Sequence, residues 1–309
     1  MRVRADDAIE LFLAGDVMTG RGVDQILPHP SEPRIFEDYV TDAREYVALA
    51  EARNGTIPAP VAPAYPWGDA LDELDRAAPF ARIVNLETSV TTSSAYLPKG
   101  INYRMHPGNV ACLSAAKLDG VVIANNHVLD FGIEGLLETL DVLHHAGIRT
   151  AGAGRDRDEA ERPMIFEGEG DGRLLVYAVG TESSGVPSLW GASESTPGVA
   201  FFDETSPEDL ARLCRRIAEG KRPRDLVVVS RTGATSSPPR TGASRTPSSS
   251  PAWTSCTVTP RTIPGPSRCT ARDSSSTAAV ICSTTTRASA ATRATAASSP
   301  CSISRGSSV

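Results

Sequence analysis

The last 79 residues of the chain contain no leucine, which limits where a hydrophobic core can form. Residues 1–230 contain 21 leucines, whereas residues 231–309 also lack Phe, Tyr, His, Lys, Glu, Asn and Gln, and hold 19 Ser and 15 Thr. A segment of this composition buries too little apolar surface to offset its conformational entropy. We therefore expect one folded domain over residues 1–230 and a disordered low-complexity tail over residues 231–309.

Apolar runs and helix-type periodicity alternate along the first 230 residues. Strands are predicted at 9–16, 81–87, 120–127, 173–180 and 225–230, and helices at 39–52, 68–78, 107–119, 132–147 and 206–220. One face of the helix at 132–147 carries Ile133, Leu136, Leu137, Leu140 and Leu143. Strands that alternate with helices predict an α/β fold with a layered sheet.

The charge is distributed unevenly between the two parts. Residues 1–230 hold 22 basic and 36 acidic side chains, a net charge of −14, whereas the tail holds nine Arg and one Asp. An acidic body argues against a nucleic-acid partner. The sequence has no apolar run of signal-peptide length and none near the roughly 20 residues of a membrane span. We expect a cytoplasmic protein without a membrane anchor, and membrane association stays open.

Polar side chains follow three of the predicted strands. They are Asp16, then Asn85 and Glu87, then Asn125, Asn126 and His127. Ligand chemistry in a layered α/β fold gathers at the carboxyl ends of strands. Carboxylate, amide and imidazole groups suit Mn²⁺, Fe or Zn²⁺, and two such ions can activate a water for attack on a phosphoester.

Each group also has a purely structural explanation. Asp16 follows a glycine and could form a turn or cap a helix, and Asn125 to His127 could be a hydrogen-bonded turn. Arg104 flanks a predicted loop and could contact an anionic substrate. A metal site is favoured because the three strand ends carry these groups together.

Three stretches resemble the CapA proteins associated with poly-γ-glutamate capsule synthesis. They are "LFLAGDVMTGR", "IVNLETSVT" and "VVIANNHVLDFGIEGLLETLDVLHHAGI". The resemblance covers residues 9 to about 230 and implies a metallophosphatase-like layered α-β-β-α sandwich, here truncated, with two divalent metals in the intact protein. It implies metal ligation by Asp16, Glu87 and Asn126, and a catalytic His127 that faces the substrate. Asn85, Asn125 and Arg104 are expected to contact the substrate, an anionic small molecule or polymer.

The resemblance also implies two later histidine motifs that this chain lacks. A His-Trp-Gly and a second, His-rich motif are expected after the strand at 225–230, yet no histidine follows His145. A shifted reading frame accounts for this absence. Arg231 to Ala234 can be encoded by codons that give His-Trp-Gly when reading starts at the third base of each codon. In the same frame the bases TC of a serine codon TCN end a triplet nTC, which encodes Phe, Leu, Ile or Val. We therefore expect a frameshift near codon 230 and an inactive, poorly soluble chain as written.

The sequence leaves three functions open. The first is a CapA-like protein of poly-γ-glutamate synthesis with a metal-dependent phosphatase-like site. The second is a general two-metal phosphoesterase, and the third is a non-catalytic assembly or binding subunit. A shared fold does not decide among them.

Overall fold

The computed structural model describes residues 9–168, residues 171–232 and two further strands, Ser255–Val258 and Ala279–Thr284. Its main sheet has the strand order β12-β1-β2-β5-β6, and a second sheet has the order β13-β11-β9-β8. The strands of the main sheet are β1 (Ile9–Val17), β2 (Ala81–Leu86), β5 (Gly120–Val122), β6 (Arg149–Ala151) and β12 (Ser255–Val258). Those of the second are β8 (Met164–Glu167), β9 (Arg173–Gly180), β11 (Leu226–Thr232) and β13 (Ala279–Thr284). The prediction of an α/β protein is confirmed.

Strands β1, β2, β5 and β6 are parallel, so their carboxyl ends meet at one edge of the main sheet. In the second sheet β9 runs parallel to β11, and β8 is antiparallel to β9. Because a parallel sheet needs a crossover between successive strands, the chain passes through helices between β1, β2, β5 and β6.

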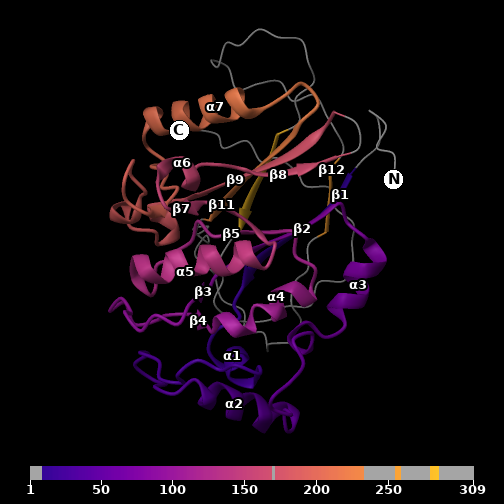
Figure 1. Cartoon of the computed structure of the whole chain (residues 1–309), viewed down its shortest axis with the longest axis vertical. Helices are drawn as coiled ribbons and strands as arrows, with labels where there is room; N and C mark the ends of the chain where they lie inside the picture. The colour runs from indigo at the N-terminus through magenta and orange to yellow at the C-terminus, as the bar shows by residue number, and fades with distance from the viewer. Residues whose placement is uncertain (1–8, 169–170, 233–254, 259–278, 285–309) are drawn as a thin grey trace, which may run out of the picture.

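The two faces of β9 pack against different layers. Leu174, Val176 and Ala178 join the core that contains the main sheet, whereas Leu175 and Tyr177 form a separate cluster with Leu213 of helix α7 (Pro207–Gly220). This alternation follows the two-residue period of a strand whose two faces are both buried. Figure 1 shows the resulting order of layers, with α7 above the second sheet and the main sheet below it.

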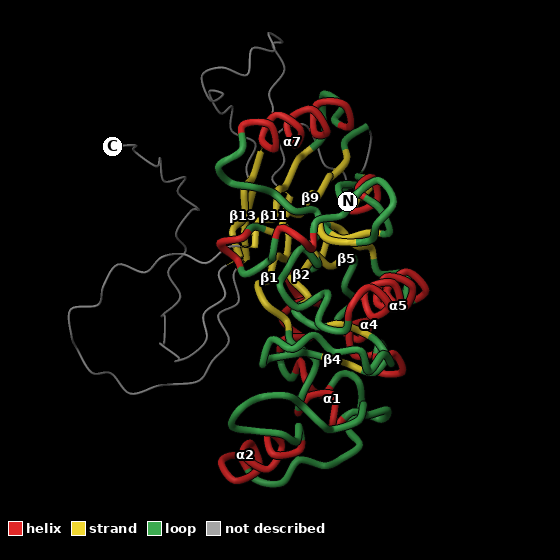
Figure 2. The backbone as a smooth tube through the Cα atoms, turned by 90° about the vertical axis from the view of Figure 1, so that its left-hand side faces the viewer, coloured by secondary structure: helices red, strands yellow, loops and turns green. Residues whose placement is uncertain are grey.

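Helices cover the far side of the main sheet. Helix α5 (Gly132–His145) packs Leu136, Leu140 and Leu143 into the core, where they are completely buried. Helices α4 (Ala111–Ala115) and α3 (Ala70–Ala77) add Leu113 and Leu74 to the same core. Figure 2 shows α4 and α5 on the side of the strands opposite to α7. Ile133, which the sequence places on the same face, lies in the first turn of α5 and is 44% exposed.

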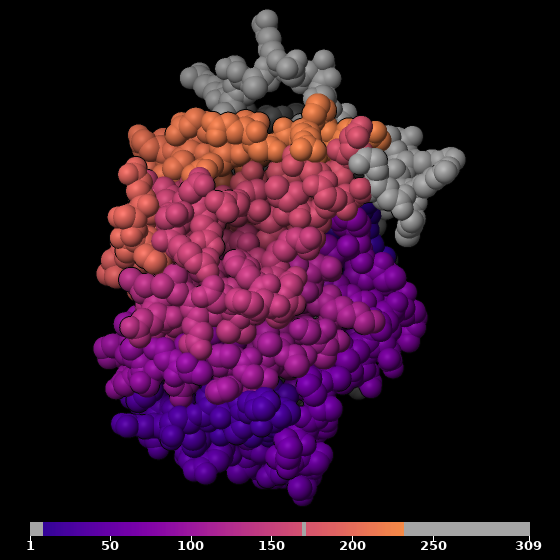
Figure 3. All heavy atoms as spheres, viewed as in Figure 1, coloured from indigo at the N-terminus to yellow at the C-terminus, as the bar shows by residue number. Residues whose placement is uncertain are grey.

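The excursion between β1 and β2 contains α1 (Gly22–Ile26), α2 (Arg44–Asn54) and α3. Helices α1 and α2 contact each other and form one end of the molecule, whereas α3 lies nearer the main sheet (Figure 1). In the space-filling view this indigo end lies opposite to the orange α7 (Figure 3). Helix α2 begins five residues later than the predicted start at residue 39, because Asp42 accepts a hydrogen bond from the main-chain N–H of Arg44 at 2.9 Å and starts the first turn there.

The remaining elements are short. They are the strands β3 (Ser89–Val90), β4 (Arg104–Met105), β7 (Ala153–Gly154) and β10 (Gly198–Val199), helix α6 (Arg157–Ala160), and the 3₁₀ turns η1 (Tyr65–Trp67), η2 (Pro107–Asn109), η3 (Glu182–Ser184) and η4 (Ser188–Trp190). In the described part of the chain, every helix is too short or too polar to cross a bilayer.

Two segments of the predicted disordered tail are strands. Ser255–Val258 (β12) pairs antiparallel with β1, and Ala279–Thr284 (β13) pairs parallel with β11, which itself reaches Thr232. The expectation of disorder does not hold for these segments. An edge strand offers unpaired N–H and C=O groups, which an added segment can pair through its main chain alone. The rest of the predicted tail lies outside the described residues.

Candidate functional site

A bulge at the end of β1 brings Asp16 beside Asn85. The parallel register pairs Ala14 with Val84 and Asp16 with Asn85, so one residue of β1, Gly15, has no partner on β2. Bulges of this kind redirect a side chain near the end of a strand. The "AGD" of the sequence therefore places a carboxylate at the carboxyl edge of the main sheet.

Asn85 joins two carboxylates. Its Nδ2 donates to Asp16 Oδ1 and to Glu87 Oε1, each at 2.8 Å, and its Oδ1 accepts from Asn125 Nδ2 at 3.0 Å. Asn125 Nδ2 also donates to the main-chain oxygen of Leu86 at 2.8 Å, which ties the loop after β5 to the end of β2. Asn85 and Asn125 are completely buried. Their amides hold Asp16 and Glu87 together.

The Glu87 carboxyl is almost completely buried, with 1% of its surface exposed. Burial raises its pKa to about 8, and the negative charge of Asp16 adds to this, although the hydrogen bond from Asn85 acts in the opposite direction. A cation at this position would stabilise the ionised form of Glu87 against both effects.

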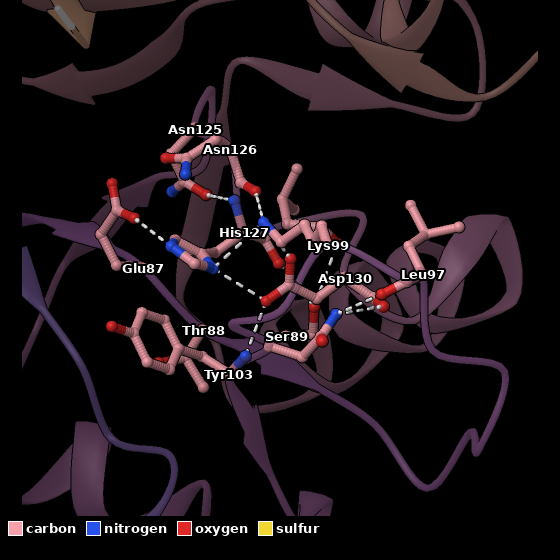
Figure 4. A network of polar contacts seen from close by, with 12 residues as sticks. Glu87, Thr88, Ser89, Leu97, Lys99, Tyr103, Asn125, Asn126, His127 and Asp130 are labelled. Atoms are coloured by element: carbon pink, nitrogen blue, oxygen red, sulfur yellow. Dashed lines mark hydrogen bonds and ion pairs between the residues drawn. The ribbon is translucent and has the colours of Figure 1, made fainter. Parts of the chain in front are cut away.

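His127 faces Glu87 with one nitrogen and Asp130 with the other. Its Nδ1 lies 2.8 Å from Asp130 Oδ2, and its Nε2 lies 3.7 Å from Glu87 Oε2 (Figure 4). The main-chain N–H of His127 donates to Asn125 Oδ1 at 3.0 Å. Burial lowers the pKa of the imidazole, although the bond to Asp130 opposes this. The ring is therefore neutral near pH 7, and Asp130 favours the tautomer with the proton on Nδ1.

Lys99 closes the network on the other side of Asp130. Its Nζ forms an ion pair with Asp130 Oδ1 at 2.6 Å and donates to the main-chain oxygen of Asn126. The ammonium also lies 5.6 Å from the centre of the Trp190 ring, which belongs to η4. The Asn126 side chain is turned toward a third segment, because a Cβ added to Gly185 would lie 3.6 Å from the Cβ of Asn126.

Arg104 lies apart from this cluster. Its Nη1 donates to the main-chain oxygen of Ser93 at 2.9 Å and its Nη2 to that of Glu32 at 3.2 Å, while the guanidinium lies over the Phe131 ring. The structure thus brings together five of the seven residues selected from the sequence: Asp16, Asn85, Glu87, Asn125 and His127. Asn126 is joined to them through its main chain.

Asp130 and Tyr103 belong to the site but were not selected from the sequence. Tyr103 lies against the His127 ring with 4.1 Å between ring centres, and its main-chain N–H donates to Asp130 Oδ2 at 2.6 Å. The spacing His127-x-x-Asp130 was a usable signal, since a carboxylate three residues after a histidine can reach its ring within one turn. No local signal marks Tyr103, which lies 24 residues before His127 and directly precedes β4.

The donor chemistry fits a divalent cation. Asp16 and Glu87 supply carboxylate oxygens, a ligand type that Mn²⁺, Fe and Zn²⁺ take, and His127 lies beside them with its Nε2 toward Glu87. Across residues 9–168 and 171–232, however, no three His, Cys, Asp or Glu side chains are already arranged as a metal-binding group.

Comparisons with known proteins agree with the sequence resemblance. The family described as "Bacterial capsule synthesis protein PGA_cap" matches residues 10–236. A "Probable polyglutamine synthesis accessory protein" of Mycobacterium tuberculosis is 43% identical over 226 residues, which cover 72% of this chain and 60% of that protein. The "PGA biosynthesis protein CapA" of Bacillus subtilis is 23% identical over 233 residues, which cover 74% of this chain and 50% of that protein. The chain therefore matches about half to three fifths of the length of these relatives.

Proposed function

The chain belongs to the bacterial capsule synthesis family PGA_cap, and from this premise we propose that its strand-end cluster is a divalent-metal hydrolytic site that serves poly-γ-glutamate synthesis. The observation that carries the proposal is the single amide of Asn85, which holds the carboxylates of Asp16 and Glu87 together. Two carboxyl groups held together, one of them almost completely buried, are stabilised in their ionised form by a bound cation. The substrate that this chemistry suits is an anionic phosphorylated or carboxylated compound.

In this proposal Asp16, Glu87 and Asn126 hold the metal. When bound, a divalent ion supplies a Lewis acid that polarises a phosphoryl oxygen and lowers the pKa of a coordinated water. The buried amides of Asn85 and Asn125 are committed to neighbouring groups of the chain, so we give them a positioning role in place of the substrate contacts expected from the sequence.

His127 is the general base in this proposal. Its neutral Nε2 faces the Glu87 carboxyl and can accept a proton, while Asp130 holds the Nδ1 proton and stabilises the imidazolium that results. Lys99 neutralises Asp130 on its other oxygen and thereby limits how far Asp130 raises the basicity of the ring. Because Arg104 is tied to two main-chain carbonyls, its proposed contact with the substrate requires those bonds to break.

We propose further that the chain as written has an incomplete site. The donors described here come from β1, β2 and the loop after β5, and no histidine follows His145 that could supply the two later motifs. The match to the family ends at residue 236, ten residues after Leu226, the last leucine of the sequence. Both observations support a frameshift near codon 230. Sequencing the gene across codons 225–235 tests this, and an intact frame there would rule it out.

A non-catalytic subunit is the second candidate. It is favoured by the word "accessory" in the name of the Mycobacterium tuberculosis relative. A general two-metal phosphoesterase would share the metal site but would act on substrates unrelated to polyglutamate.

The deciding experiment restores the frame and measures metal-dependent hydrolysis of phosphomonoesters and phosphodiesters. The proposal expects hydrolysis that Asp16→Ala and His127→Ala abolish and that the exposed control His144→Ala leaves intact. A folded, metal-loaded and inert protein would support the subunit instead. Equal activity on every simple phosphoester, with no effect of added polyglutamate, would favour the general phosphoesterase.

A further inference from the structure

Arg21 has a main-chain conformation that residues other than glycine rarely adopt. Its φ is 52° and its ψ is −129°, immediately before α1. Such a conformation persists only where the surrounding structure enforces it, and it is frequent at functional sites. The preceding Gly20 explains the constraint, because a Cβ there would lie 2.9 Å from the main-chain oxygen of Arg104. The loop after β1 is thus pressed against β4, next to Tyr103.

The Arg21 side chain is fixed from three directions. Its Nη2 forms an ion pair with Glu37 Oε1 at 2.5 Å, and the Glu37 side chain is completely buried. Its Cζ lies 4.4 Å from the centre of the Tyr103 ring and 5.0 Å from that of Tyr46. The Tyr46 hydroxyl donates to Glu37 Oε2 at 2.5 Å. A planar cation held by a buried carboxylate and two aromatic faces has little freedom to rotate.

Tyr103 connects this guanidinium to the candidate site. One contact of its ring is with Arg21 and another is with the imidazole of His127, at 4.1 Å between ring centres and an angle of 36°. Figure 4 shows the Tyr103 ring beside the imidazole of His127, which lies between Glu87 and Asp130. The rotation of His127 is therefore limited by Asp130 at Nδ1 and by Tyr103 at its ring.

We infer that Arg21 is a positioning residue for His127, acting through the Tyr103 ring. Arg21 fixes the plane of Tyr103, and Tyr103 fixes the imidazole so that Nε2 faces Glu87. Glu37 and Tyr46, which hold Arg21, come from the long excursion between β1 and β2. This excursion therefore helps to orient His127. The inference rests on the proposed function only in taking His127 as the reacting group.

The test measures the His127 ring directly, by long-range ¹H–¹⁵N NMR of the histidine side chains in the full chain. The sequence has five histidines, and the signals of His127 are identified by their loss in His127→Gln. We expect Arg21→Met and Tyr103→Leu to shift the same His127 signals and to change the tautomer ratio, while the signals of His29, His106, His144 and His145 stay in place. Arg21→Lys, which keeps the charge but loses the planar group, should shift the His127 signals in the same direction.

Arg34→Met is the matched control, because Arg34 also lies over an aromatic ring, that of Phe36 at 5.5 Å, and belongs to the same excursion. It should leave the His127 signals unchanged. A folded Arg21→Met protein with His127 signals identical to those of the parent chain would overturn the inference. If Arg21→Met does not fold, Glu37→Gln is used, since it keeps the acceptor for Tyr46 and removes only the ion pair. Unshifted His127 signals in that variant would overturn the inference equally.

This measurement needs no turnover. A shift of the His127 signals, together with a frame-restored protein that is folded but has no hydrolytic activity, would refute the proposed function and support the positioning role. Hydrolysis by the frame-restored protein, with unshifted His127 signals in Arg21→Met, would support the proposed function and refute the positioning role.

Discussion

Glu87 is the residue whose environment is most unusual for its chemistry. It is a carboxyl group that is 1% exposed, accepts a hydrogen bond from Asn85 and lies near a second acid, Asp16. Buried acids without a partner cation tend to take up a proton, which is why the pKa of Glu87 is raised to about 8. The same group would become a strong ligand once a cation neutralises it.

Glu87→Gln should therefore stabilise the metal-free protein at high pH. The folded pKa lies above the ordinary value of 4.5, so the folded state holds this proton more tightly than the unfolded state does. Stability is then lost as the pH rises from about 4.5 to about 8, and Gln removes that loss. In EDTA at pH 8.5, urea unfolding should show a gain of a few kcal/mol and at most about 5 kcal/mol, since the pKa is raised from 4.5 to about 8 and each pKa unit corresponds to about 1.4 kcal/mol.

The exposed Glu134 on α5 provides the control, and Glu134→Gln should change the free energy of unfolding by less than about 0.5 kcal/mol. A large loss of stability in Glu87→Gln at pH 8.5 would mean that the carboxylate has a cationic partner in the protein itself, contrary to the geometry described above.

At the scale of the elements, the two sheets and their covering helices place the site. The parallel strands β1 and β2 end side by side, and the bulge at Gly15 sets Asp16 opposite Asn85. On the outer side, α5 packs Leu136, Leu140 and Leu143 into the core, and this fixes the end of the loop that carries His127. A substitution on the buried face of α5 should therefore act mainly by lowering the free energy of unfolding, and should affect the geometry of the site only indirectly.

Leu140→Ala should lower the free energy of unfolding by roughly 2–5 kcal/mol, because it removes a completely buried side chain and leaves a cavity. Ile133→Ala, on the same helix but 44% exposed, should cost less than about 1 kcal/mol. Urea unfolding of the two variants measures the difference. Equal losses would show that the face of α5 is assigned incorrectly.

A buried ion pair joins the starts of β9 and β11. Arg173 Nη2 lies 2.5 Å from Asp225 Oδ2, and the Asp225 side chain is completely buried. Burial alone would raise the pKa of Asp225, but the hydrogen bonds from Arg173 and from the main chain of Arg222 hold it below its ordinary value. Its contribution to stability is therefore present above pH 4 and is lost as the pH falls through the lowered pKa.

Asp225→Asn should cost roughly 3–5 kcal/mol at pH 7, since it leaves the Arg173 guanidinium buried without its charge partner. Arg173→Met combined with Asp225→Leu should recover most of this loss. The free energies of unfolding by urea at pH 7 decide, and a single variant as stable as the parent would contradict the role of the pair.

At the scale of the whole molecule, site residues that follow a single strand could be predicted from the sequence, whereas residues whose role depends on contacts between distant segments could not. Asp16, Glu87 and His127 were found because each follows an apolar run, and parallel strands bring such ends together whatever the loops do. Arg21 and Tyr103 were missed because their importance arises from the approach of β4 to the loop after β1, which depends on Gly20 and leaves no periodic signal. The strands β12 and β13 were missed because edge pairing needs main-chain atoms only.

The central claim is that Asp16, Glu87 and His127 belong to a divalent-metal site which this chain holds in incomplete form. Equilibrium dialysis against Mn²⁺, followed by metal analysis of the protein, tests it most directly. The chain as written should retain less than one ion per molecule, the frame-restored chain should retain about two, and Asp16→Asn with Glu87→Gln should abolish retention in both. Tight binding of two ions by the chain as written, or retention unaffected by the paired substitution, would contradict the account.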